Sequence, residues 1–202
     1  MSSMFDTDVV DIKMLFPTPM CDITIQNPAR SAIQNEMQNA VNGISWISAP
    51  TGWGKTHQFS NNNFNEDEIE KLKLNNFKSV LAYHVEQYAI RILKFAYKPF
   101  RTTSWFTKFD KGEYAHMHSH TDADISGCYY FKTSGNDGNI FFRTPVSTAE
   151  SSHCYGYFAQ SYEITPSAGK LLLFPGWLLH GVQTNETDVD RISLSFNIYF
   201  NR

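Results

Sequence analysis

Residues 191–200, with the sequence RISLSFNIYF, alternate polar and apolar side chains without interruption. Successive side chains of a β-strand point to opposite faces of the sheet, so this strand has one polar and one apolar face. A solvated face normally carries Lys, Glu and Thr, whereas this one carries an arginine, small hydroxyls and an amide. We therefore expect the polar face to line a cavity and the apolar face to pack on helices, with an ordinary solvent-facing strand as the alternative.

Seven segments upstream share an aromatic and β-branched character and are separated by turn-forming residues. They are residues 102–109, 114–120, 125–132, 139–144, 154–160, 170–175 and 177–182. The sequence SGNDGN at 134–139 predicts a β-hairpin between the third and fourth of them. About eight strands without intervening helices are typical of a sandwich, a barrel or a jelly roll.

The first half of the chain is predicted to be helical. Asn27 can cap a helix whose first residue is Pro28 and which stops near Gly43. A longer helix is expected over 65–98, with His84 as a packing residue close to its apolar stripe.

Together these patterns predict one domain over residues 1–202, mainly β with N-terminal helices. Residues 1–99 would form a mostly helical support region. Residues 100–202 would form a jelly-roll catalytic core, also called a double-stranded β-helix or cupin-like fold, with the supporting helices on one face.

Composition and charge narrow the functional classes. The chain has 202 residues, of which 42% are hydrophobic, and its formal net charge is −3 at pH 7. This charge argues against a nucleic-acid-binding surface, which needs clustered Lys and Arg in excess. No apolar run approaches the length of a bilayer span, and the N-terminus lacks a basic start followed by an apolar core. We therefore expect no membrane partner and a cytoplasmic location.

The sequence APTGWGKT at 49–56 satisfies the permissive form of the phosphate-loop pattern, with Ala49 in place of the first glycine. A working phosphate loop joins a buried strand to a helix, yet the polar sequence HQFSNNNFN follows here. A glycine-rich surface turn is therefore the preferred interpretation.

The stretch HMHSHTDAD at 116–124 is dense in metal-ligand residue types. His116, His118, His120 and Asp122 would share one face of a strand, because all four lie at even positions. Non-haem Fe(II) oxygenases bind iron through two histidines and a carboxylate, and a His-x-Asp pair on one strand can supply two of these ligands. His120 with Asp122 has this spacing, His118 with His120 has its all-histidine equivalent, and imidazole also suits Fe(II), so both pairs stay open.

Two downstream residues would complete such a site. A lone histidine such as His180, which follows an apolar strand, is more often a packing residue, but Arg191 comes shortly after it. A cosubstrate such as 2-oxoglutarate chelates iron through two positions, and its far carboxylate needs a cation. The planar fork of arginine meets a carboxylate through two parallel hydrogen bonds. Arg191, with Ser193 beside it on the same face, occupies the place that this chemistry requires.

These motifs resemble the 2-oxoglutarate/Fe(II)-dependent oxygenases found in marine bacteria and phages, which are distant relatives of the prolyl hydroxylases. The resemblance covers most of the chain, and its motifs are specific in combination. They are Gly112 with Tyr114, the His-Ser-His at 118–120, SGCYY at 126–130, FPGWLLH at 174–180 and RISLSFN at 191–197, with LFPTP at 15–19 and the Gly-Trp turn at 52–53.

The resemblance implies that His118, His120 and His180 bind the metal. Asp122 is the alternative second ligand, because TDAD stands where the family usually has a proline and a small residue. Arg191 would anchor the cosubstrate carboxylate. The other candidate pocket residues are Ser193, Tyr130 and Tyr129 beside the cosubstrate, and Asn197, Trp177 and His116 beside the substrate. Residues 144–168, which include His153, are expected to form loops near the pocket mouth.

The expected function is hydroxylation of a small-molecule or peptidyl substrate by molecular oxygen, with Fe(II) and 2-oxoglutarate as cofactors. In this reaction 2-oxoglutarate is decarboxylated oxidatively to succinate. One alternative is a cupin-like metalloenzyme that does not use 2-oxoglutarate, in which Arg191 would be superfluous. The other is a non-enzymatic jelly-roll module with a binding or structural role, which would need no Fe(II).

Overall fold

The computed structural model describes residues 17–50, 56–96, 98–146, 151, 153 and 161–201. The helical elements are α1 Ala29–Val41, α2 Glu68–Lys71, α3 Asn75–Gln87 and the π-helix η1 Tyr88–Ile92. The strands are β1 Cys21–Thr24, β2 Ile47–Ser48, β3 Gln58–Phe59, β4 Phe100–Phe109, β5 Ala115–His118, β6 Ile125–Lys132, β7 Ile140–Phe142, β8 Tyr162–Ile164, β9 Lys170–Pro175, β10 His180–Val182 and β11 Arg191–Phe200.

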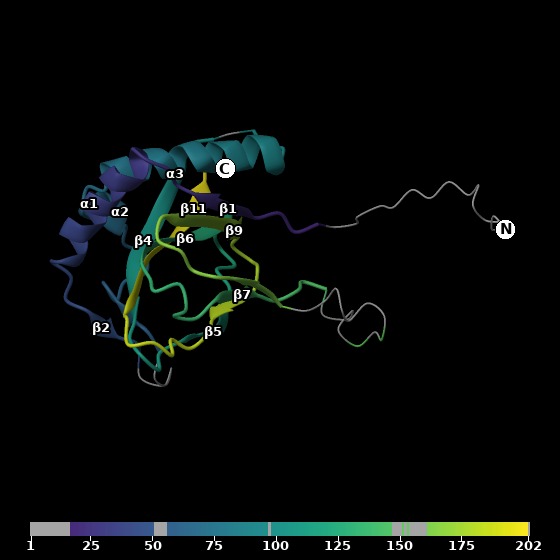
Figure 1. The fold of residues 1–202 in the computed structure, drawn as a ribbon. Coiled ribbons are helices and arrows are strands. Elements are labelled where there is room, and N and C mark those ends of the chain that lie inside the picture. Colours follow the sequence, from purple (N-terminus) through teal and green to yellow (C-terminus); the bar gives the residue numbers. More distant parts are fainter. Residues whose placement is uncertain are drawn as a thin grey trace, which may run out of the picture.

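The strands form two antiparallel sheets, and the helices cover the outer face of the larger one (Figure 1). The seven-stranded sheet has the order β1-β9-β6-β11-β4-β3-β2, and the four-stranded sheet has the order β5-β10-β7-β8. The predicted architecture, a mainly β double-stranded β-helix with helices on one face, is confirmed. None of the helices in the described residues is both long and apolar enough to span a membrane.

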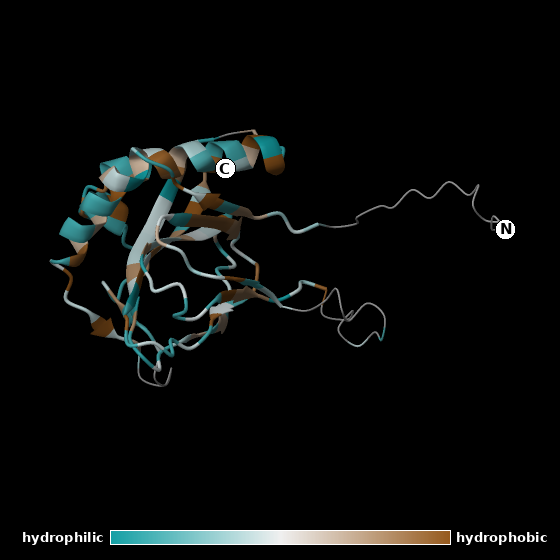
Figure 2. Cartoon of the chain, in the orientation of Figure 1, coloured by the Kyte–Doolittle hydropathy of each residue, from teal (hydrophilic) through white to brown (hydrophobic). Residues whose placement is uncertain are grey.

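Strand β11 lies in the centre of the larger sheet, where it pairs with β4 on one side and β6 on the other. Its apolar residues Ile192, Leu194, Phe196 and Ile198 belong to the hydrophobic core between this sheet and the helices. Figure 2 shows α1 and α3 with both hydrophobic and hydrophilic residues, as expected for helices that bury one face. The apolar half of the predicted alternation is therefore confirmed.

A second core lies between the two sheets. Strand β6 shows how alternation serves both cores, because Tyr129 packs on the helix side and Tyr130 lies between the sheets. In β9, Leu171 and Leu173 pack with the helices, and Leu172 packs between the sheets. The period of two thus assigns each neighbouring side chain to a different core.

The prediction of a single long helix over residues 65–98 is wrong. The chain forms α2, α3 and η1 instead, and Lys73 between the first two has a φ of 54°, in the left-handed region that interrupts a helix. The N-cap of α2 is Asp67. Its carboxylate accepts hydrogen bonds from the Ile69 amide at 3.1 Å and from the Ser104 hydroxyl at 2.6 Å. The first helix begins one residue later than predicted, at Ala29.

The β-hairpin predicted at 134–139 is also wrong, because β6 and β7 belong to different sheets. Asp137 is fully buried in this turn, and its carboxylate accepts hydrogen bonds from the hydroxyls of Thr133 and Ser134. The turn therefore carries the chain across from one sheet to the other. The strand predicted at 154–160 and residues 51–55 of the phosphate-loop-like pattern lie outside the described residues. So do residues 147–150, 152 and 154–160 of the loops predicted over 144–168.

The close contact at Gly127 in β6 generates a stability prediction. A Cβ atom there would lie 2.3 Å from the carbonyl oxygen of Leu172 and 2.5 Å from the ring of Phe196. We expect Gly127→Ala to lower the free energy of unfolding by about 1–3 kcal/mol, because it overpacks the core, as measured by urea denaturation. Gly43→Ala is the control, since its nearest contact would be 3.6 Å away. Equal stability of Gly127→Ala and the wild type would contradict this packing.

Candidate metal centre

Three histidine side chains converge at one end of the smaller sheet. His118 ends β5 and His180 begins β10, and the two residues are paired across these strands. His120 lies two residues beyond β5, and one ligand atom from each of the three residues lies within 4.8 Å of the other two. The ring centroids are 4.4 Å apart for His118 and His180, and 5.0 Å apart for His118 and His120. Three imidazoles in this arrangement can bind a single metal ion.

Backbone carbonyls fix the tautomers of two of these rings. Nδ1 of His118 lies 2.7 Å from the carbonyl oxygen of His116, and Nδ1 of His180 lies 2.8 Å from that of Leu178. A carbonyl can only accept, so each Nδ1 carries the proton and donates it. The Nε2 lone pair of each ring is then available to a metal, which is the usual arrangement of metal-binding histidines.

Loss of contact with water favours the uncharged form of the three rings, of which His180 is buried, His120 is half-buried and His118 is the most exposed. Desolvation lowers the pKa of His180 to about 3 and that of His120 to about 4, and it lowers the pKa of His118 as well. Charge on His118 further lowers the pKa of the other two rings, whereas Asp122 raises that of His120. The rings are therefore neutral near pH 7, which is the form that binds metals. Neutral imidazole is also a donor that suits Fe(II).

His120 reaches the cluster through a turn and not through the strand alternation expected for 116–122. Strand β5 ends at His118, and the His120 amide then donates to the carbonyl of Gly176 at 2.8 Å. Gly176 allows this approach, because a Cβ atom would lie 2.7 Å from the His120 carbonyl oxygen. Asp122 is exposed and lies outside the ligand cluster, with Oδ2 3.5 Å from the hydroxyl of Tyr199.

The cluster opens into a cavity of about 610 Å³ between the two sheets. The polar residues of β11 line it, namely Arg191, Ser193, Ser195, Asn197 and Tyr199, so the polar half of the predicted alternation is confirmed. His116 and Tyr130 also line the cavity, but Trp177 and Tyr129 do not. Trp177 is 50% exposed, and Tyr129 packs against Phe77 on the helix side, with ring centroids 5.3 Å apart.

Arg191 is a buried cation at the base of this cavity and is 1% exposed. Its Nη1 donates to the carbonyl of Gly138 at 2.7 Å, and its guanidinium carbon lies 4.1 Å from the ring centroid of Phe109. Among the described residues its Nε has no hydrogen-bond partner, and no carboxylate forms an ion pair with it. A buried guanidinium with an unsatisfied donor fits the carboxylate of a bound anion.

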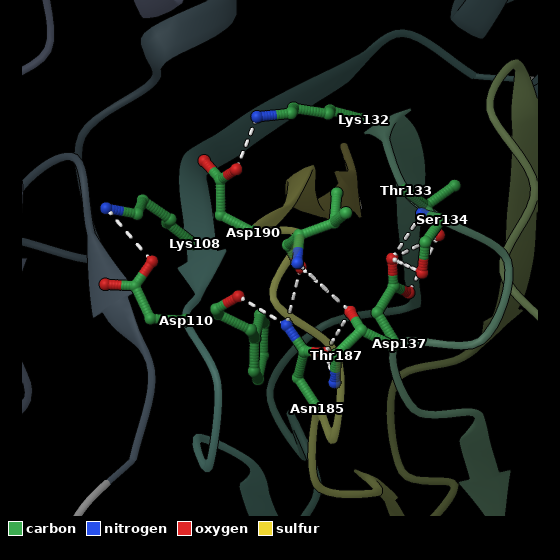
Figure 3. A network of polar contacts seen from close by, with 11 residues as sticks. Lys108, Asp110, Lys132, Thr133, Ser134, Asp137, Asn185, Thr187 and Asp190 are labelled. Carbon is green, nitrogen blue, oxygen red and sulfur yellow. Dashed lines mark hydrogen bonds and ion pairs between the residues drawn. The ribbon is translucent and has the colours of Figure 1, made fainter.

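A polar network outside the cavity holds the loops around Arg191 (Figure 3). Because Asp137 accepts hydrogen bonds from Thr133 and Ser134, its carboxylate is satisfied within its own turn. The side-chain amide of Asn185 donates to the carbonyls of Phe109 at 3.0 Å and Val189 at 2.8 Å. These bonds fix the backbone on both sides of the guanidinium.

Sequence reasoning missed several cavity residues, among them Thr56 and His57. Both are buried, and among the described residues the Thr56 hydroxyl has no hydrogen-bond partner. Thr56 is the last residue of the phosphate-loop-like pattern, and His57 begins the polar stretch after it, which has no hydrophobic periodicity. Nothing local identifies them, because the pairing of β3 with β4 brings them to the cavity.

Comparison with known proteins gives one family and a large set of similar folds. The family described as "Putative 2OG-Fe(II) oxygenase" matches residues 103–197. A search of curated proteins finds no match.

Among solved structures, a prolyl-4-hydroxylase from Pseudomonas putida is 12% identical with a TM-score of 0.62, over 91% of this chain and 94% of that one. HygX from Streptomyces hygroscopicus, solved with nickel and 2-oxoglutarate bound, is 14% identical with a TM-score of 0.60, over 90% of this chain and 82% of HygX. The carbocyclase SnoK from nogalamycin biosynthesis is 9% identical with a TM-score of 0.65, over 91% of this chain and 80% of SnoK. At these identities the structures establish a shared fold.

The family match includes the His-Ser-His sequence, His180 and Arg191. It supports neither the non-enzymatic module nor the metalloenzyme without 2-oxoglutarate that the sequence left as alternatives. The match over residues 103–197 supports assignment of the chain to the 2OG-Fe(II) oxygenases, enzymes that use iron, 2-oxoglutarate and molecular oxygen.

Proposed function

We propose that this oxygenase hydroxylates a small-molecule or peptidyl substrate, with iron bound by His118, His120 and His180 and with 2-oxoglutarate anchored by Arg191. The observation that carries the proposal is the convergence of three imidazole ligand atoms within 4.8 Å of one another in the cavity that also holds the buried arginine. When bound, the cofactors supply the oxidation, in which one oxygen atom of O₂ enters the substrate and the other enters succinate as CO₂ is released.

The protein's own residues position the reactants and hold their charges. His118 and His180 present their Nε2 lone pairs because their Nδ1–H groups donate to carbonyls. Arg191 offers its free Nε edge to the far carboxylate of 2-oxoglutarate. Ser193 and Tyr130 line the cavity beside Arg191, although Ser193 also shares a hydrogen bond of 2.8 Å with the hydroxyl of Thr107.

Asn197 and His116 are the candidates for substrate contact. The hydroxyl of Ser126 donates to Oδ1 of Asn197 at 2.7 Å, which orients the amide so that its NH₂ group can donate to a substrate. We propose Asp122 as a third candidate for substrate contact, since it lines the cavity but lies outside the histidine cluster. The net charge of −3 favours a substrate other than nucleic acid, and a cytoplasmic location remains part of the proposal.

We also propose that residues 1–202 form one domain. Strands β1, β2 and β3 from the N-terminal half belong to the same sheet as the C-terminal strands. The N-terminal half therefore contributes strands to the core in addition to the helical support.

Loss of one histidine tests the ligand set. We expect His180→Ala to weaken Fe(II) binding by at least about 100-fold under anaerobic conditions, because it removes a direct ligand. Asp122→Asn should bind Fe(II) like the wild type, and His84→Ala serves as a matched control on α3. Loss of Fe(II) from Asp122→Asn, with His118→Ala unaffected, would show that Asp122 is a ligand and that the proposed set is wrong.

Conservative replacement of the arginine tests the cosubstrate anchor. Arg191→Lys keeps the charge but loses the planar fork, so 2-oxoglutarate should bind at least about tenfold more weakly. The visible charge-transfer band of the anaerobic Fe(II) protein reports this binding, and Fe(II) affinity without 2-oxoglutarate should stay unchanged. The exposed Arg91→Lys is the control. Unchanged 2-oxoglutarate affinity in Arg191→Lys would refute a bidentate anchor.

A further inference from the structure

His57, Phe109 and Arg191 lie in one row of the larger sheet, with His57 directly before β3, Phe109 in β4 and Arg191 in β11. Arg191 and Phe109 are paired across β11 and β4. Gln58 is paired with Lys108 across β3 and β4, so the preceding residue, His57, lies opposite Phe109. All three residues line the cavity.

The side chains of this row stack. The rings of His57 and Phe109 are nearly parallel, with an interplanar angle of 8° and centroids 4.5 Å apart. The Arg191 guanidinium carbon lies 4.1 Å from the same phenyl centroid. Because Phe109 belongs to the middle strand, its ring lies between the imidazole and the guanidinium. The imidazole and the guanidinium thus contact the same phenyl ring, with the cation at one end of the row.

His57 is itself held firmly. It is 7% exposed, and its Nδ1 faces the carbonyl oxygen of Tyr114 at 3.4 Å. Burial lowers its pKa to about 3, so the ring is neutral near pH 7 and does not repel Arg191. It lies outside the histidine cluster and therefore has no role as a ligand in that set.

The orientation of Arg191 matters for its proposed role. Nη1 is engaged with the carbonyl of Gly138, which leaves the edge formed by Nε and Nη2 for a carboxylate. Bidentate recognition requires the plane of this edge to match the plane of the carboxylate. A guanidinium free to rotate over Phe109 would lose that match.

We propose that His57 is a positioning residue for 2-oxoglutarate, which packs on Phe109 and thereby fixes the plane of the Arg191 guanidinium. The inference rests on the proposed role of Arg191 in binding the far carboxylate. It assigns part of cosubstrate binding to the N-terminal half, outside the segment 103–197 that the family matches.

Replacement of the imidazole by side chains with and without a flat ring tests the stack. His57→Phe keeps a planar ring, whereas His57→Leu keeps much of the volume without one. In anaerobic titrations of the Fe(II) protein, we expect His57→Leu to bind 2-oxoglutarate about tenfold more weakly and His57→Phe to stay within about twofold of the wild type. Fe(II) affinity without 2-oxoglutarate should be unchanged in both, and His84→Leu is the matched control.

A second measurement needs no cosubstrate. The Arg191 Nε–H should give a sharp ¹⁵N-correlated signal in the wild type and in His57→Phe, and a broadened one in His57→Leu, because the guanidinium loses its fixed plane. Thermal unfolding identifies any variant that fails to fold, in which case His57→Ala replaces it. The inference is overturned if His57→Leu keeps both the wild-type affinity and the sharp signal, or if His57→Phe is as impaired as His57→Leu. A wild type that shows no charge-transfer band with 2-oxoglutarate would instead overturn the proposed function itself.

Discussion

Backbone pairing fixes strand β11 along its whole length, since each of its ten residues has a partner on β4 and seven of them also have one on β6. A slip of one residue would exchange every side chain between the two faces of the sheet. Leu194 and Phe196 would then leave the core against the helices, and Arg191 and Ser193 would enter it. The hydrophobic core and the cavity are therefore two consequences of one register.

That register also decides how a buried positive charge is tolerated. A guanidinium removed from water needs compensating contacts. Here the carbonyl of Gly138 accepts a hydrogen bond from it, and the face of Phe109 makes a cation–π contact with it. The loops that carry these groups are tied by Asp137 and Asn185 through their own polar contacts (Figure 3). Among the described residues Nε has no hydrogen-bond partner, and this unsatisfied donor supports our proposal that Arg191 binds the carboxylate of 2-oxoglutarate.

The sequence predicted much of the β core and less of the helical half. Strands β6, β9 and β11 have the predicted bounds, because alternation and aromatic content are properties that short segments carry themselves. The continuous helix and the hairpin failed for a different reason. Lys73 takes a left-handed backbone that interrupts the helix, and β6 and β7 on either side of the turn at Asp137 join different sheets. Which sheet a strand joins depends on pairing with distant segments, which local sequence preferences do not encode.

By itself the sequence determined the residue types of the site and the face on which β11 presents them. Spacing nominated His118, His120, Asp122, His180 and Arg191, but it treated 116–122 as one strand and left the second ligand open. Only the tertiary structure separated His120 from Asp122, because the chain leaves β5 after His118 and packs against Gly176, which brings one side chain inward and leaves the other exposed. It alone brought His57 to Arg191, because cross-strand neighbours are set by long-range pairing, which local periodicity does not encode.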